Sequence, residues 1–185
     1  MGCNTNLAKE PVHPVGGRTP REVVPLTHEY RVAKKEVIAE VTIAGEKPAV
    51  LTLFLAGQTR RHAGEERPSD LLNGPDIFLP AIDHTGKVRL LRRDAVVVMT
   101  VPAEHEPGAA GPEAETAPLP SSRHAEVEVI LESGAVIRGT VEYDMPETRS
   151  RLIDYLNRED RCLAVRQAGR VHLVNKRQIA RVNEV

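Results

Sequence analysis

An internal repeat is the feature that most limits what this chain can fold into. The segment 70–73 (DLLN) aligns with 154–157 (DYLN), and the segment 86–93 (GKVRLLRR) aligns with 169–176 (GRVHLVNK). The stretches upstream of these segments match in their pattern of apolar residues rather than in identity. Self-similarity of this kind is typical of two copies of one structural unit, here about 60 to 70 residues each. The sequence therefore predicts a tandem duplication.

The segments outside the two copies differ from them in composition. Between the copies the chain holds five prolines and four glutamates from 102 to 122, without apolar periodicity. Such a segment buries too little apolar surface to offset its ordering entropy, so we expect an extended linker. The N-terminal end is also rich in proline and glycine. The predicted organisation is a flexible tail at 1–30, a first β domain at 31–101, an acidic linker at 102–123 and a second β domain at 124–185.

Each copy has the pattern of a β domain. In the second copy Val127, Val129 and Leu131 alternate with other residues, which predicts a strand with one buried face. Ser133-Gly134 favours a tight turn into a second strand. A glycine inside that second strand, Gly139, indicates a bulge or a sharp bend.

After the second strand the alternation stops. Leu152, Tyr155 and Leu156 are spaced as on one apolar face of a short helix. Three further strands follow, and Leu163 in the first of them is an expected core residue. Short, curling strands in such a small unit favour a small barrel or a strongly bent sheet. The predicted fold class is mainly β, with five strands in each unit and a helix between the second and third.

The repeated segments resemble a bacterial family of small domains of unknown function. That family is marked by an Asp-x-Leu-Asn segment, a Phe-Leu-Pro segment and a closing strand with Asn-x-x-x-Ile. The first copy has the first two features, in Asp70, Leu72, Asn73, Phe78, Leu79 and Pro80. The second copy has the first and third, in Asp154, Leu156, Asn157, Asn175 and Ile179. It has Cys162-Leu163-Ala164 in place of Phe-Leu-Pro, and the first copy has Arg92 in place of Asn175. The resemblance implies a domain type and no activity.

The upstream half of the second copy is also similar to the first motif of Sm-like small barrels. The segment 127–144 (VEVILESGAVIRGTVEYD) has an alternating strand, a turn glycine, a strand with Gly139 and a closing acidic residue. The second Sm motif, with its Arg-Gly or Lys-Gly pair, is missing, and a helical segment follows instead. The similarity therefore implies a Sm/SH3-like barrel shape and no RNA-contacting residue.

The repeated polar residues Asp70, Asn73, Asp154 and Asn157 are candidates for a role in each unit. Aspartate and asparagine bond to nearby backbone groups and favour turns and helix ends. We interpret them as structural caps of the short helix. A catalytic carboxylate would need a base, a nucleophile or a metal ligand beside it, and none repeats with these residues. The sequence therefore predicts no catalytic residues and no enzyme.

Histidines and cysteines give no sign of a metal site. The seven histidines lack helical i, i+4 spacing and do not cluster with cysteines. His172 is expected on the solvent-facing side of its strand. Cys162 occupies the position of Phe78 in the first copy, which indicates a buried and inert thiol. We predict no metal and no cofactor.

Basic residues form a few pairs rather than a stripe. The net charge is -1 and aromatic residues make up 3% of the chain, which does not favour a nucleic-acid module. The pairs are either solvated surface or contacts to phosphate. The candidate interaction residues are Arg60, Arg61, Arg92, Arg93, Lys176 and Arg177.

A protein-interaction adaptor or scaffold is the function that the sequence favours. Two units on a linker suit bivalent binding of a protein partner, because the tether raises the effective concentration of the second contact. In the alternative, the units pack as one pseudo-symmetric body that forms homo-oligomers. A nucleic-acid-binding module is the second hypothesis, and an enzyme the third. No apolar run is long enough to cross a membrane and no leader pattern is present, so we expect no membrane partner and a cytoplasmic location.

Overall fold

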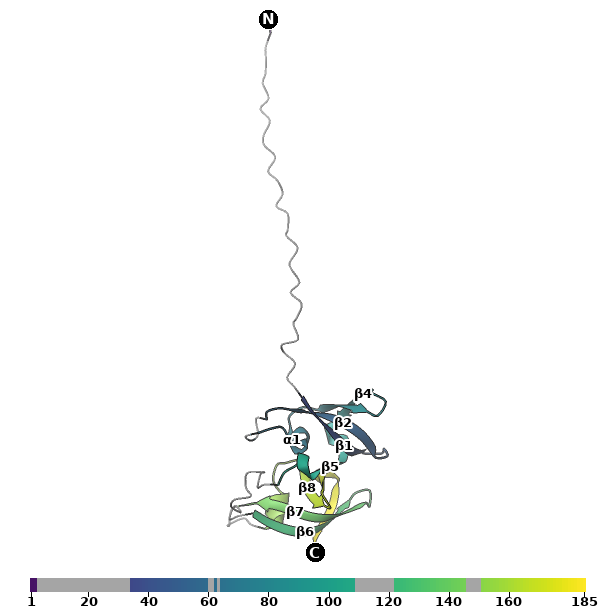
Figure 1. Cartoon of the computed structure of the whole chain (residues 1–185), viewed down its shortest axis with the longest axis vertical. Coiled ribbons are helices and arrows are strands. Elements are labelled where there is room, and N and C mark those ends of the chain that lie inside the picture. Colours follow the sequence, from purple (N-terminus) through teal and green to yellow (C-terminus); the bar gives the residue numbers. More distant parts are fainter. Residues whose placement is uncertain (3–33, 60–61, 63, 109–121, 146–150) are drawn as a thin grey trace. The chain divides into compact units, whose positions relative to one another are not determined.

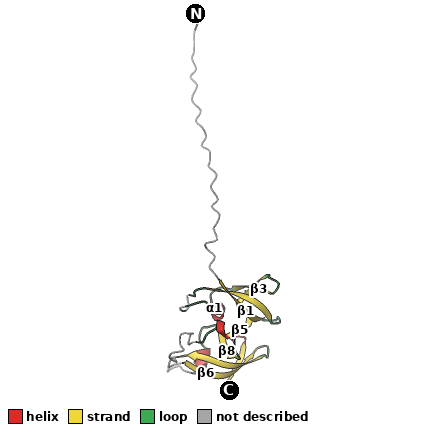
Figure 2. Cartoon of the chain, in the orientation of Figure 1, coloured by secondary structure: helices red, strands yellow, loops and turns green. Residues whose placement is uncertain are grey.

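The computed structural model describes residues 1–2, 34–59, 62, 64–108, 122–145 and 151–185. All helices and strands given below lie within residues 34–185 (Figures 1 and 2). Apart from its first two residues, the predicted tail at 1–30 lies outside the described residues.

The described chain is mainly β-sheet, as the sequence predicts. The first half contains β1 (Lys34–Ile43), β2 (Ala49–Ala56), α1 (Pro68–Asn73), β3 (Phe78–Asp83), β4 (Val88–Arg92), η2 (Arg93–Ala95), β5 (Val96–Pro102) and η3 (Ala103–His105). The second half contains β6 (Ser122–Leu131), β7 (Val136–Asp144), α2 (Leu152–Leu156), β8 (Cys162–Gln167), β9 (Arg170–Asn175), η6 (Lys176–Gln178) and β10 (Ile179–Glu184). In both halves two strands precede a short helix, two strands follow it, and a 3₁₀ turn leads into the fifth strand.

All these strands belong to one antiparallel sheet. Its order is β10-β6-β7-β8-β9-β5-β1-β2-β3-β4. Five neighbouring strands come from each half, and β9 of the second half pairs with β5 of the first. The hydrogen-bonded order has two ends, at β10 and β4, so the sheet as a whole is not closed.

Two buried apolar clusters lie along the sheet, and each draws on both halves. The first is built mostly from first-half strands but includes Val171 and Leu173 of β9. The second is built mostly from second-half strands but includes Val97 and Val98 of β5. Because apolar side chains from both halves share each cluster, unfolding one half would expose core surface of the other.

The core residues expected from the strand alternation are buried. Val127, Val129 and Leu131 are at most 4% exposed, and Leu163 is fully buried. Period-two alternation places these side chains on one face of their strands, and that face meets the core. The sequence-based prediction of the core in the second copy is therefore confirmed.

Of the two features expected at Gly139, a bulge or a sharp bend, the pairing of β6 with β7 excludes the bulge. The β6–β7 pairing runs through Val127 and Gly139 without a register shift, so no bulge is present there. A Cβ atom at position 139 would overlap the carbonyl oxygen of Arg166 in β8. Glycine is required because the β8 backbone approaches closely at this point, which a single sequence does not distinguish from a bulge.

Ordered structure extends into both ends of the segment predicted as a linker. Strand β5 runs to Pro102 and leads into η3, and β6 begins at Ser122, while 109–121 lie outside the described residues. Glu106 is 5% exposed, and its carboxylate accepts hydrogen bonds from the backbone N–H of Ser69 (3.0 Å) and from the Ser69 hydroxyl (2.7 Å). Composition did not reveal this, because the partner in α1 is far away in sequence.

Candidate interaction surface

The two halves meet where β5 pairs with β9. Met99 lies opposite Leu173 and Val101 lies opposite Val171 in an antiparallel register, and all four side chains are at most 1% exposed. Between these apolar pairs, Thr100 Oγ1 lies 2.9 Å from His172 Nδ1, within hydrogen-bond distance. We call this pairing the internal junction. It combines a strand ladder with buried apolar contact, which is the usual basis of sheet stability.

Asn73 ties α1 of the first half to β8 of the second. Its Oδ1 accepts hydrogen bonds from the backbone N–H groups of Arg161 (2.7 Å) and Cys162 (3.2 Å). Its Nδ2 donates to the Cys162 Sγ (3.3 Å). The side chain that we interpreted as a helix cap therefore bridges the two halves.

A second asparagine also connects the two halves. Asn175 Nδ2 donates to the backbone carbonyls of Asp94 (3.3 Å) and Val96 (3.0 Å), where η2 leads into β5. Nearby, Arg161 Nη1 lies 3.0 Å from Asp94 Oδ1 in an ion pair across the halves. These groups are polar and separate in sequence, so periodicity alone could not find them.

The other predicted cap residues lie in the two helices. Asp70 Oδ2 accepts from the backbone N–H of Arg67 (2.9 Å), which satisfies one of the unpaired donors at the start of α1. Asp154 lies in the first turn of α2, and Asn157 follows its last residue. Asp70, in addition, lies 2.8 Å from His62 Nε2.

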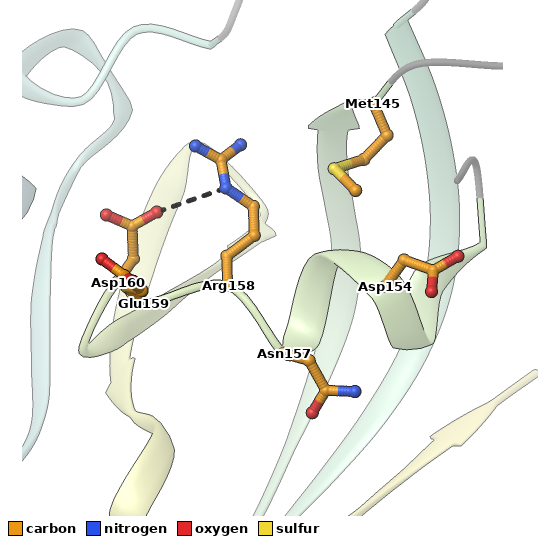
Figure 3. A pocket seen from close by; sticks show the side chains of 6 residues that line it. All are labelled: Met145, Asp154, Asn157, Arg158, Glu159 and Asp160. Carbon is orange, nitrogen blue, oxygen red and sulfur yellow. Dashed lines mark ion pairs between the residues drawn. The ribbon is translucent and has the colours of Figure 1, made fainter. Parts of the chain in front are cut away.

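A hollow of about 540 Å³ lies beside α2 and contains Asp154 and Asn157 (Figure 3). The Asn157 side chain extends from the end of the helix, away from the ion pair of Arg158 and Asp160 (Figure 3). Asn157 is exposed, whereas Asn73 at the matching position of the first half is half-buried under β8. The two halves therefore differ in whether a strand covers this asparagine.

The structure separates the predicted basic residues. Arg92 and Arg177 are exposed, and Arg177 Nη1 lies 3.8 Å from Asp94 Oδ2. Arg93 is 4% exposed and donates from Nη1 to the Gly74 carbonyl, so it belongs to the interior. Arg60 and Arg61 lie outside the described residues.

Lys176 is half-buried in the second half and does not form a basic patch. Its Nζ donates to the Arg158 carbonyl (3.1 Å) and lies 5.8 Å from the centre of the Tyr155 ring. Burial lowers the pKa of the Lys176 ammonium from its ordinary value. These contacts hold Lys176 against Tyr155 of α2 and the residue Arg158 that follows the helix.

Cys162 lies at the start of β8 and His172 lies in β9, in the internal junction. Cys162 is 7% exposed, and burial raises the pKa of its thiol to about 12, so the thiol is protonated at neutral pH. The expected buried position is confirmed, but Phe78 at the matching position is 54% exposed. His172 alternates with the fully buried Val171 and Leu173, as predicted, but it is only partly exposed, because β5 pairs along the edge of its strand.

The edge formed by β3 and β4 exposes large apolar side chains. Strand β4 ends the sheet and pairs only with β3 among the described strands. Exposed fractions at this edge are 67% for Ile77, 54% for Phe78, 66% for Val88 and 68% for Leu90. Soluble proteins usually protect sheet edges with charge or proline, so an apolar edge marks a candidate interaction surface. We call these four residues the apolar edge.

The turn before β4 is held by Asp83. Its carboxylate accepts from the Thr85 hydroxyl (2.6 Å) and from Arg89 Nε (2.9 Å). Hydrogen bonds, first of all from Thr85, hold the pKa of the Asp83 carboxyl well below its usual range. The β3–β4 hairpin is thus fixed at its tip, which presents β4 as a pre-organised edge.

Comparison of the chain with protein-family models, with curated proteins and with solved structures found no match. Within the described ranges, no group of three or more His, Cys, Asp or Glu side chains could hold a metal ion. None of the helices described has the length and apolar character needed to cross a membrane.

Proposed function

We propose that the chain is a tandem duplication of one small bent-sheet unit and that it acts as a non-enzymatic scaffold in the cytoplasm. Its docking surface is the apolar edge, which would accept a strand from a protein partner. The observation that carries the proposal is the grouping of Ile77, Phe78, Val88 and Leu90 around the edge of β4 with which no described strand pairs. Main-chain hydrogen bonds to an open edge supply affinity, and side chains beside it supply specificity.

The internal junction supports a rigid scaffold rather than two tethered domains. Apolar clusters shared by both halves restrict the motion of one half against the other. The basic residues give less support to a nucleic-acid function, since Arg93 is buried and Lys176 packs on Tyr155. A sequence-independent nucleic-acid surface needs exposed cations along a groove.

Affinity capture with an edge variant tests this proposal. The full-length chain is used as bait with nuclease treatment, beside Val88→Lys/Leu90→Lys, which places charge on the open edge. The control is Ile38→Lys/Val136→Lys, which makes the same charge change at residues 65% and 48% exposed on β1 and β7. We expect protein partners, including further copies of the chain, to be retained by the wild type and the control and lost from the edge variant. Equal capture by all three, or recovery of nucleic acid in place of protein, would contradict the proposal.

A further inference from the structure

We infer that the partner of β4 is β10 of a second copy of this chain, so that the internal junction is repeated between molecules. The inference rests on the proposed function, because it names the occupant of the same apolar edge. The sheet ends at β4 on one side and β10 on the other. Strand β4 is the fourth strand of the first half, and β10 is the fifth strand of the second half. The internal junction also pairs a fourth strand, β9, with a fifth strand of the other half, β5.

The matching of strands follows from sequence and from backbone pairing. Segment 86–93, which contains β4, aligns with 169–176, which contains β9. Strands β5 and β10 share an irregularity in their pairing. Where β5 pairs with β1, the register shifts between Thr42 and Ile43 of β1. Where β10 pairs with β6, the register shifts between Ile179 and Arg181 of β10. A bulge changes the direction of the strand that follows it, so the two bulges serve as a common reference point for aligning β5 with β10. The first paired residue beyond the shift is Val98 in β5 and Arg181 in β10, and these two residues are therefore aligned.

This alignment gives the register of the contact between molecules. The Met99–Leu173 pair of the internal junction corresponds to Val182 of one molecule opposite Leu90 of the next. The Val101–Val171 pair corresponds in the same way to Glu184 opposite Val88. The pair Thr100–His172 becomes Asn183–Arg89, in which the asparagine oxygen can accept from the guanidinium.

Burial supports the same contact. Val171 and Leu173 are fully buried because β5 covers them, whereas their counterparts Val88 and Leu90 are 66% and 68% exposed. Cys162 is 7% exposed and its counterpart Phe78 is 54% exposed. The apolar edge therefore exposes the side-chain positions that a neighbouring half covers at the internal junction. Covering them would remove apolar surface from water and pair the open backbone groups.

The asparagine beside α2 fits this arrangement. At the internal junction Asn73 Oδ1 accepts from the N–H groups of Arg161 and Cys162. Its counterpart, Asn157, is exposed beside the hollow of about 540 Å³ in Figure 3. In the assembly Asn157 of one molecule would accept from the N–H groups of Ile77 and Phe78 of the next.

One position weakens the contact relative to the internal junction. Arg181 would lie opposite Leu91, where the internal junction places Val98 opposite Val174. A charge on the edge strand disfavours tight pairing, so we expect a reversible contact that depends on concentration. Because the two edges differ, the contact is heterologous and joins molecules head to tail.

Cross-linking at the deduced register tests the inference. Full-length chains carry Leu90→Cys with Val182→Cys, and Cys3→Ser removes the tail thiol, while Cys162, which is 7% exposed in the unsubstituted chain, is retained in every variant. The register control is Leu90→Cys with Asn183→Cys, since neighbouring residues on a strand point to opposite faces. We expect mild oxidation to give disulfide-linked multimers from the first variant at least tenfold more than from the control. Equal yields from both, or none from either, would overturn the deduced contact.

Sedimentation velocity of the uncross-linked chain separates this inference from the proposed function. We expect the wild type and the Ile38→Lys/Val136→Lys control to form larger species as concentration rises, and Val88→Lys/Leu90→Lys to remain a monomer. A wild type that is monomeric at all concentrations would overturn self-assembly. If the edge variant still lost its protein partners in the capture experiment, the proposed docking edge would stand and only its occupant would be wrong.

Discussion

Replacing Asn73 by alanine is expected to destabilise the fold by breaking the tie between the halves. The substitution removes the hydrogen bonds to the backbone of Arg161 and Cys162 and to the Cys162 sulfur. The N–H of Arg161 is at an exposed site where water replaces the lost acceptor, so its loss costs about 0.5–1 kcal/mol. The N–H of Cys162 is part-buried, and leaving such a donor without a partner costs about 1–3 kcal/mol. We expect a loss of about 2–3 kcal/mol.

Urea unfolding of dilute full-length protein measures this loss. With a slope of about 1–3 kcal/mol per molar urea, the midpoint should fall by about 1 M while the slope is unchanged. The matched control is Asn157→Ala, because Asn157 occupies the same place in the second half and is exposed in the single chain. Its loss should stay below about 0.5 kcal/mol, as at most surface sites. Equal losses for the two variants, or none for Asn73→Ala, would refute the argument.

Three further predictions follow from buried groups. Gly139→Ala should destabilise by about 1–3 kcal/mol in the same assay, because its Cβ meets the Arg166 carbonyl, and an unchanged midpoint would contradict that close approach. In a Cys3→Ser chain, Cys162 should react with an alkylating reagent at pH 8 only as fast as the protein unfolds, since burial raises the pKa of its thiol to about 12; rapid labelling of this folded variant would show that the site is open. Burial raises the pKa of the Glu106 carboxyl in the folded chain, so stability should decrease as pH rises from the ordinary glutamate pKa through the raised folded one, and Glu106→Gln should remove that slope.

The sequence predicted the parts of the fold that depend on local patterns. Alternation located the strand with Val127 and Val129 and placed Leu163 in the core, because a strand with one buried face has a period of two. These inferences need only the neighbours of a residue along the chain.

The parts that were missed depend on the pairing of distant strands. Nothing local indicates that β9 pairs with β5, so the partial burial of His172 was not foreseen and Asn73 was assigned to its own helix. The same pairing explains why Phe78 and Cys162 differ in exposure although they align. A repeat predicts that two units are alike, but their environments differ where one copy is covered and the other is at an edge.

The central claim is that the two halves form one sheet through β5 and β9, and through-space NMR contacts between backbone protons test it most directly. The measurement uses dilute Val88→Lys/Leu90→Lys, in which contacts between molecules are suppressed. The account predicts cross-strand contacts for the pairs Met99–Leu173 and Val101–Val171, with slow amide exchange along both strands. Absence of these contacts, with β5 and β9 exchanging as rapidly as the free edges β4 and β10, would show that the halves are separate domains.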